Sequence, residues 1–342
     1  MIKGNKRSVA ACVATAALAA GALAAVDIVH AQEALSSLFR VEVDLVVLNV
    51  TVTDRRGRYI KDLKPEQFRV FEDGVPQRLA SFGEGNAAPT TVATIDTRIV
   101  DATVPGSQPA EPAAGAMNES FAGTNVFILF DTSNFMYRTF VYAEDAIADF
   151  IRGLDKADSV ALYGFSRNLT RHASLTDNRL EALKGLRSSV AGDQTALYNA
   201  LLLTLRDAAQ VPGRKVVIVF SNGPDTASTV GPDDVGSIAE DEGIPIYVIS
   251  TKELNRDAVS SNAFRRITNR TGGRAFFAKT WQRQSEAFVS IKDELESSYT
   301  LAYYPQNNPN AGWRNIEVEL TGDDLKRYRI RTRNGYRPKL SD

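Results

Sequence analysis

The feature that most constrains the fold is a series of short, unbroken apolar runs that begins near Asn125. The runs cover residues 126–130, 216–220 and 246–249. A strand that is half exposed alternates apolar and polar residues, whereas a strand buried on both faces of a parallel sheet is continuously apolar. The runs therefore predict an α/β domain built on a doubly wound, mostly parallel sheet.

The segments between these runs carry apolar residues at helical spacing, so that each segment presents one apolar face. Such faces suit helices that cover the two sides of a parallel sheet. The three predicted faces are Phe140, Ala143, Ile147, Phe150, Ile151 and Leu154; Leu197, Ala200, Leu201, Thr204, Leu205 and Ala208; and Trp281, Phe288, Ile291 and Leu295.

Period-two patterns flank this domain on both sides and predict β-strands. We expect a small β-sandwich-like domain at 37–84, a linker rich in Ala, Pro, Gly and Thr at 85–123, the α/β domain at 124–298, and β-hairpins at 299–340. Val41 and Val43 are on one phase and Val46 and Val50 on the other, which predicts a bulge or a strand buried on both faces. Because neither β-rich piece has much core of its own, the hairpins could pack on the first β domain.

The N-terminus has the organisation of a secretory signal peptide. Lys3, Lys6 and Arg7 precede an apolar run at 8–26, and small residues at 29–31 suit a signal peptidase. We predict cleavage after Ala31, export to the periplasm or the extracellular space, and no membrane span afterwards. The single cysteine, Cys12, leaves with the signal, so the mature chain has no disulfide.

Charge and histidine content exclude several classes of function. The 40 basic and 41 acidic residues give a net charge of -1, which does not favour nucleic acid as a partner. One of the two histidines, His30, lies in the predicted signal, so that His172 alone remains. A Ser-His-Asp triad and a histidine-rich metal site are therefore unsupported, and we predict that the protein is not an enzyme. A hydrolase is kept as the weakest alternative.

Oxygen-bearing side chains follow two of the buried runs and open one of the helices. Asp131 and Ser133 follow the first run, Thr195 precedes the helix at Leu197, and Asn222 and Asp225 follow the second run. In an open parallel sheet, ligands bind outside the carboxyl ends of the strands, so these loops are the predicted ligand-facing surface. Capping of nearby helices by Asp131, Ser133 and Thr195 is the alternative interpretation.

The order of these motifs resembles that of a von Willebrand factor A domain over about residues 125–297. An apolar strand is followed by an Asp-x-Ser loop, by Thr-Ala-Leu-Tyr at 195–198, and by a strand with Ser-x-Gly-x-Asp-Thr at 221–226. Val-Thr-Val-Thr-Asp at 50–54, Phe-Glu-Asp-Gly at 71–74 and Gly-Tyr-Arg at 335–337 resemble the Acidobacteria-type subgroup of these proteins. The resemblance implies an interaction domain.

The family's metal-ion-dependent adhesion site joins an Asp-x-Ser-x-Ser loop, a threonine and an aspartate at one Mg²⁺, which leaves a coordination position for a carboxylate of the partner. On this resemblance, Asp131, Ser133 and Thr195 match the family's ligand positions. The same face would contact a protein or peptide partner directly.

Two positions depart from the pattern. Phe135 stands where the second serine is expected, and Asn222 stands where the aspartate is expected, while Asp225 could lend charge nearby. We therefore predict an exported binding protein with a degenerate adhesion site. Its partner surface would be formed by Asp131, Ser133, Phe135, Thr195 and Asn222, with no cofactor required and at most weak binding of Mg²⁺ or Mn²⁺. A true Mg²⁺- or Mn²⁺-dependent adhesion module, with Asn222 or Asp225 completing the shell, is the alternative.

Overall fold

The computed structural model describes residues 45–92, 123–134, 136, 140–252, 257–306 and 308–339, and the statements below concern these residues. Leu45–Leu340 form one compact unit. The predicted signal peptide at 1–31, most of the predicted linker and Phe135 lie outside the described residues.

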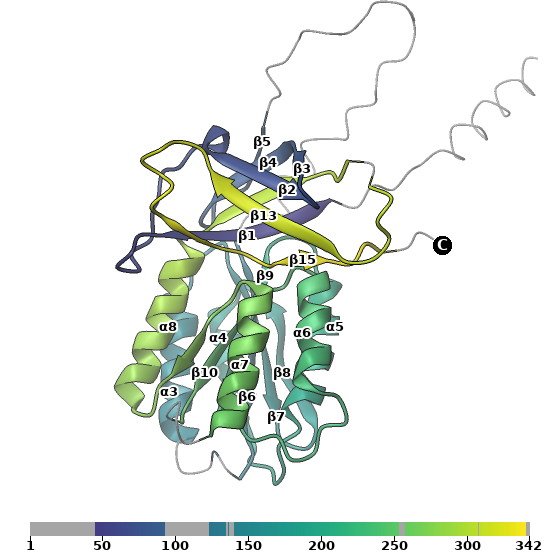
Figure 1. Cartoon of the computed structure of the whole chain (residues 1–342). Helices are drawn as coiled ribbons and strands as arrows, with labels where there is room; N and C mark the ends of the chain where they lie inside the picture. The colour runs from purple at the N-terminus through teal and green to yellow at the C-terminus, as the bar shows by residue number, and fades with distance from the viewer. Residues whose placement is uncertain are drawn as a thin grey trace, which may run out of the picture. The chain divides into compact units, whose positions relative to one another are not determined.

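A six-stranded sheet forms the centre of the α/β part, in the order β11-β10-β9-β6-β7-β8 (Figure 1). Neighbouring strands are parallel except β8, which pairs antiparallel with β7 at one edge. The predicted fold class, a doubly wound and mostly parallel sheet, is confirmed. The strands are β6 (Asn125–Asp131), β7 (Ser159–Phe165), β8 (Leu169–Thr176), β9 (Lys215–Ser221), β10 (Ile246–Ser250) and β11 (Ala275–Phe277).

Six helices cover the two faces of this sheet in the described part of the chain. Core residues of α3 (Phe140–Gly153), α4 (Arg179–Arg187) and α8 (Trp281–Leu295) share one hydrophobic cluster. Core residues of α5 (Leu197–Ala209), α6 (Pro232–Asp241) and α7 (Ala258–Thr271) share the other. The chain thus crosses the sheet on both sides, as a doubly wound fold requires.

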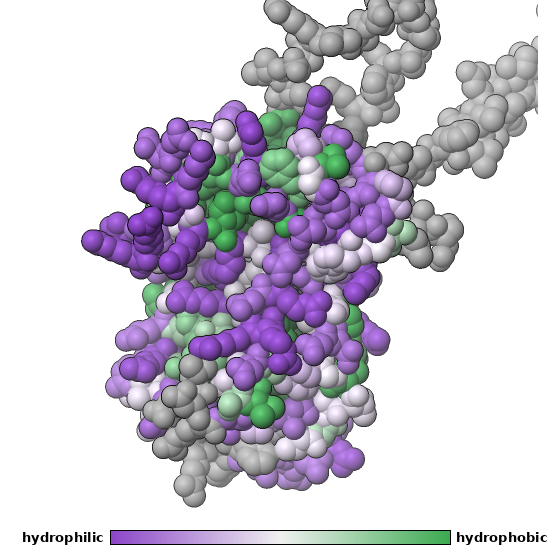
Figure 2. Space-filling view, in the orientation of Figure 1, coloured by the Kyte–Doolittle hydropathy of each residue, from purple (hydrophilic) through white to green (hydrophobic). Residues whose placement is uncertain are grey.

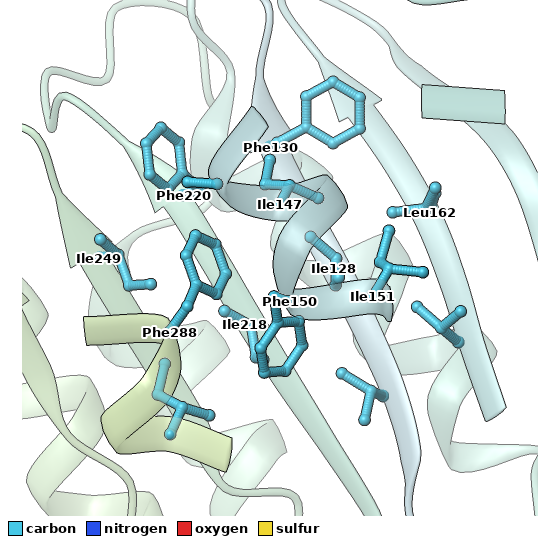
Figure 3. Packing of buried hydrophobic residues seen from close by; sticks show 14 of the residues in the cluster. Ile128, Phe130, Ile147, Phe150, Ile151, Leu162, Ile218, Phe220, Ile249 and Phe288 are labelled. Atoms are coloured by element: carbon cyan, nitrogen blue, oxygen red, sulfur yellow. The ribbon is translucent and has the colours of Figure 1, made fainter. Parts of the chain in front are cut away.

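The central strand β6 shows why its apolar run is unbroken. Ile128 and Phe130 belong to the first cluster, whereas Phe127 and Leu129 belong to the second, because successive side chains point to opposite faces. In Figure 3, Phe150 and Phe288 approach each other on the first face, and their ring centroids are 5.1 Å apart. Burial of each such side chain contributes roughly 1.5–3 kcal/mol, so this sheet is a rigid base for the loops at its edge.

Strands from both ends of the described chain build a β-sandwich. One sheet has the order β14-β1-β12-β4-β5 and the other β15-β13-β2-β3, and their apolar residues share one core. The strands are β1 (Val46–Thr53), β2 (Phe68–Glu72), β3 (Val75–Gln77), β4 (Leu79–Glu84), β5 (Thr90–Thr91), β12 (Tyr299–Tyr303), β13 (Arg314–Leu320), β14 (Arg329–Arg331) and β15 (Gly335–Tyr336), with a short 3-10 helix at Pro65–Gln67.

A buried ionic cluster joins this sandwich to the α/β part. Glu294 of α8 is completely buried, pairs with Arg331 of β14 at 2.6 Å, and accepts a hydrogen bond from Tyr247 Oη at 2.6 Å. Arg333, which is also buried, donates to the backbone oxygen of Glu240 at 2.8 Å and to that of Val47 at 3.2 Å. These contacts fix the sandwich to the α/β part at α8 and α6.

One sequence-based expectation about the helices is wrong. Trp281 was expected on the buried face of its helix, but it is the first residue of α8 and is 55% exposed, because the apolar contacts of α8 start further along the helix. Of the helices that the structure describes, none is long and apolar enough to cross a membrane.

Candidate functional site

The candidate site lies where the two central parallel strands end. Asp131 is the last residue of β6 and Ser221 the last residue of β9, and these strands are neighbours in the sheet. The chain leaves β6 toward β7 on one side, and β9 lies on the other side. A doubly wound sheet opens a crevice for ligands at such a switch point.

Asp131 is a buried carboxylate held only by neutral donors. It is 1% exposed; its Oδ1 accepts from the Ser133 backbone N at 2.9 Å, and its Oδ2 accepts from Ser221 Oγ at 2.8 Å. Among the described residues, none of the ion pairs includes it. Burial raises the pKa of Asp131, and interactions with Ser133, Ser221 and Asn222 only partly oppose this. No positively charged side chain therefore offsets the charge that Asp131 carries when it is ionised.

Backbone hydrogen bonds bring the loops together. The Gly192 N–H donates to the Thr132 oxygen at 2.8 Å, which ties the loop before α5 to the loop after β6. The Thr226 N–H donates to the backbone oxygen of Thr195 at 2.9 Å, which ties the loop after β9 to the same segment. Gly192 is required at its position, because a Cβ there would lie 2.2 Å from Ser166 Oγ.

Three buried side-chain oxygens in these loops have no hydrogen-bond partner: Ser133 Oγ, Thr195 Oγ1 and Asn222 Oδ1. Their residues are at most 6% exposed. A buried polar group without a partner costs about 1–3 kcal/mol, and such groups are few in native proteins. Three of them on adjoining loops beside a lone carboxylate make this region the candidate site.

Helix capping does not account for these residues. The N-cap position of α5 is Ala196, and no side chain there makes a capping hydrogen bond, so Thr195 does not cap that helix. Thr132 and Asn134, which directly follow Asp131 and Ser133, are not helical, so neither Asp131 nor Ser133 is the residue before a first helical turn. The capping interpretation is therefore wrong for these residues.

Both carboxylate oxygens of Asp225 already accept hydrogen bonds from other groups. Its Oδ2 accepts from the Tyr198 N–H at 3.0 Å and from Ser228 Oγ at 2.6 Å, and its Oδ1 accepts from the backbone N–H groups of Ala227 and Ser228. Since Tyr198 lies in the first turn of α5, Asp225 supplies the cap that Ala196 does not. These contacts argue against the prediction that Asp225 completes a metal shell.

The donor set does not fit a tightly held divalent cation. It offers one carboxylate, two hydroxyls and one amide oxygen, from Asp131, Ser133, Thr195 and Asn222. Mg²⁺ gives up its water reluctantly and is held mainly by anionic oxygens. Within the described ranges, no group of three or more His, Cys, Asp or Glu side chains could hold a metal ion. The oxygens suit a cation in kind, but the site lacks charge.

Ser221 begins the sequence motif at 221–226 but was not among the predicted site residues, and in the structure it links the two strand ends through its hydroxyl. A signal was available, because Ser221 ends its apolar run as Asp131 ends the neighbouring one. Phe135, the fifth predicted partner-binding residue, lies outside the described residues.

His172 lines a polar cavity of about 360 Å³ beside the β7–β8 hairpin, and Thr132 of the loop after β6 lines the same cavity. Its Nδ1 is 3.4 Å from Ser188 Oγ, which itself donates to the Gly185 oxygen at 2.7 Å. Burial lowers the pKa of His172. No carboxylate lines this cavity, whose residues are Thr132, Ser166, Asn168, Thr170, Arg171, His172, Ser188 and Val190.

Comparison with known proteins places the α/β part in a family. A family model described as the von Willebrand factor type A domain matches residues 125–290. A curated relative, dihydroorotate dehydrogenase (quinone) of Rhizobium leguminosarum bv. trifolii, is 28% identical over 139 residues, which are 40% of this chain. The match spans only 35% of that protein's length.

Solved structures similar to this chain include BatB of Bacteroides thetaiotaomicron, with 18% identity, 51% of this chain and 100% of that chain covered, and a TM-score of 0.43. The von Willebrand factor domain of the pilus tip protein Mfa5 of Porphyromonas gingivalis is 11% identical, with 50% of this chain and 94% of that chain covered and a TM-score of 0.43. Proximal thread matrix protein 1 of the mussel byssus, with a zinc-occupied adhesion motif, is 14% identical, with 55% of this chain and 49% of that chain covered and a TM-score of 0.44.

Proposed function

We propose that this chain, whose residues 125–290 match the family model of the von Willebrand factor type A domain, is an exported, non-enzymatic interaction protein. It binds a protein or peptide partner through the loop face around Asp131, Ser133, Thr195 and Asn222. Binding is metal-free or depends only weakly on Mg²⁺ or Mn²⁺.

One observation carries the proposal: three buried oxygens without partners lie in loops that adjoin a buried carboxylate without a counter-charge. The fold holds these groups in place at a cost in stability, and a partner that supplies donors or positive charge would remove that cost. Functional sites commonly carry such a penalty, because the groups are arranged for the bound state.

The exposed apolar side chains do not offer a competing surface on the face drawn in Figure 2. That face is mainly hydrophilic, with separate apolar areas. Exposed large apolar residues include Val259 in α7, Trp281 in α8, and Val190 and Tyr304 outside the helices and strands. Single exposed apolar residues of this kind are normal, so the polar loop face remains the better candidate.

The partner-binding role is tested with two substitutions that keep side-chain shape, Asp131→Asn and Thr195→Val, combined in one protein. Immobilised wild type and double variant are compared for proteins captured from the producer's exported fraction, and Tyr304→Ala on the sandwich is the matched control. Loss of a partner in the double variant but not in the control supports the loop face. Capture that is lost only in the control places the binding surface on the sandwich.

The alternative, a true Mg²⁺- or Mn²⁺-dependent adhesion module, differs in one measurable property. A ligand that binds only the folded state raises the apparent stability. If the wild-type melting temperature is the same in excess Mg²⁺, in excess Mn²⁺ and in EDTA, this alternative is excluded. An increase of several degrees in either metal would replace the metal-free proposal.

Export is tested separately, since it rests on the N-terminal sequence. Fractionation of producing cells should place the protein outside the cytoplasm, and sequencing of its mature N-terminus should begin at Gln32. Recovery of the uncleaved chain in the cytoplasm would contradict export. A hydrolase would be indicated only by measured turnover that Asp131→Ala abolishes.

A further inference from the structure

The mismatch at Asn222 has a chemical consequence, because Asn222 is followed by Gly223. The backbone nitrogen after an asparagine can attack the side-chain amide, and glycine, with no side chain, hinders this attack least. Asn222 Oδ1 has no hydrogen-bond partner, so no contact through this oxygen opposes such a reaction.

The surrounding groups form a proton path from the attacking nitrogen to a carboxylate. The Gly223 N–H donates to Ser221 Oγ at 3.1 Å, and Ser221 Oγ donates to Asp131 Oδ2 at 2.8 Å. An amide nitrogen becomes nucleophilic only as it loses its proton, and a positioned base increases the rate of such a step by about 10²–10⁴-fold. Ser221 and Asp131 are therefore arranged to assist attack by Gly223 N.

We propose that Asn222 is a self-modification site, at which the Asp131–Ser221–Gly223 path promotes deamidation and so adds a second carboxylate to the loop site. The inference deepens the proposed function, because it concerns the same loop site and rests on it for its role in binding. The modification itself can be measured without any partner.

The steps balance without an oxidant or a reductant. Gly223 N forms a bond to Asn222 Cγ, and its proton passes to Ser221 Oγ while the Ser221 proton passes to Asp131 Oδ2. The bond from Cγ to the side-chain nitrogen then breaks, this nitrogen takes up the proton from Asp131, and ammonia leaves a five-membered succinimide. Water, which can enter beside the partly exposed Pro224, opens the ring to an aspartate or an isoaspartate. One water is consumed and one ammonia is released.

The product changes what the site can hold. An aspartate at position 222 would place a carboxylate where the orphaned Asn222 Oδ1 now lies, beside Asp131 and the free hydroxyls of Ser133 and Thr195. Two carboxylates and two hydroxyls are hard oxygens of the kind that Mg²⁺ prefers. Fresh and aged protein should therefore differ in their response to Mg²⁺.

The chain contains a matched control in its other Asn-Gly pair, Asn334-Gly335. Gly335 pairs with Asn315 in the antiparallel ladder of β15 and β13, and the Asn334 oxygen accepts from the Ile316 N–H at 2.8 Å. Among the described hydrogen bonds, none links Gly335 N to a hydroxyl that is bound to a carboxylate. In the unfolded chain the two pairs should react alike, so their ratio in the folded protein isolates the effect of the fold.

The experiment incubates the folded full-length protein in EDTA at neutral pH and follows both pairs by peptide mass spectrometry. The mass change is that of replacing NH₂ by OH. We expect position 222 to react at least about tenfold faster than position 334 in the folded protein, and at a similar rate in denaturant. Reaction of both pairs at the same rate in the folded protein, or no reaction at position 222, overturns the proposal.

Two variants test the proton path. Ser221→Ala should slow the reaction at position 222 by about tenfold or more, whereas Ser221→Thr, which retains the hydroxyl, should restore most of the rate. If Ser221→Ala is unfolded, Asp131→Asn provides the second test and should slow the same step. An unchanged deamidation rate at position 222 in the folded variants would show that Ser221 and Asp131 do not take up the proton from Gly223 N.

A final arm separates this inference from the proposed function. After incubation, Mg²⁺ should raise the melting temperature of the aged protein and leave that of fresh protein unchanged. Deamidated protein without this shift overturns the second-carboxylate role. Partner capture is measured independently, so a failure of the partner-binding proposal would be seen there even when deamidation occurs.

Discussion

Ser221 Oγ donates a hydrogen bond to Asp131 Oδ2 at 2.8 Å and so joins the ends of β9 and β6. Both residues are at most 1% exposed. This pair places polar side chains at the ends of two strands that are otherwise apolar and buried along most of their length. The stability of the protein should depend on how the charge of Asp131 is solvated.

Asp131→Asn should raise the stability at neutral pH. Burial holds the pKa of Asp131 above its unfolded value, so the carboxyl favours folding below the unfolded pKa, and this contribution is lost as pH rises through the folded pKa. The variant should therefore melt at a higher temperature than wild type at pH 7, and the difference should vanish at about pH 3, below the ordinary pKa of an aspartic acid. Thermal unfolding at both pH values is the measurement, and a less stable variant at pH 7 would contradict it.

Thr195→Val should stabilise the protein, because it removes a buried hydroxyl that has no partner and keeps the shape of the side chain. The expected gain in free energy of unfolding is about 1–3 kcal/mol. Thr204→Val is the matched control: Thr204 is equally buried, but its Oγ1 donates to the Ala200 oxygen at 2.9 Å. Urea unfolding should show that Thr204→Val lowers the free energy of unfolding, whereas Thr195→Val raises it. Equal effects in both variants would mean that Thr195 has a partner in solution.

Glu294→Gln should destabilise the junction between the sandwich and the α/β part. It removes the carboxylate that pairs with Arg331, whose side chain is 29% exposed, so the loss should approach but not exceed the cost of about 3–5 kcal/mol for breaking a fully buried pair. Lys292→Gln, which removes a partly exposed pair with Glu296 on the same helix, should cost less than about 1 kcal/mol. Chemical unfolding of both variants tests the difference, and similar small losses would show that the buried cluster is not needed.

Asn222→Asp should create cation binding directly. The substitution adds the carboxylate that the donor set lacks, and at a Mg²⁺ concentration 100 times the dissociation constant the stabilisation would be about 2.7 kcal/mol. Asn168→Asp, which adds the same charge on the nearby β7–β8 hairpin, controls for a general electrostatic effect. Calorimetry with Mg²⁺ should give binding only for Asn222→Asp. Heat of binding in neither variant would mean that the oxygens are not arranged around one point.

The fold could be predicted because a strand that is buried on both faces is continuously apolar in sequence. The run 126–130 is apolar at every position, and in the structure its residues alternate between the two cores. Trp281 could not be placed by the same rule, since helical spacing gives a face but not the residue at which packing starts. The pairing of β1 with β12 joins segments about 250 residues apart, and no local pattern encodes it.

The meeting of the candidate-site loops could be predicted from the sequence, but the contacts within those loops could not. The position of Asp131 after a buried strand follows from the sheet rule. The commitment of Asp225 to α5 and the bond from Ser221 to Asp131 depend on how loops far apart in sequence meet. The side-chain oxygens without hydrogen-bond partners also depend on how these loops pack together, so only the folded chain shows that the Thr195 hydroxyl is buried without a partner.

The shared sandwich also sets an order of events during folding. β1 pairs with β12 and β14, so its backbone groups stay without their final partners until the end of the chain is present. Contacts of such long separation form slowly, whereas those within 125–290 are closer in sequence. The α/β part therefore has the means to form first, and loss of the last strands should leave β1 as an open edge prone to aggregation.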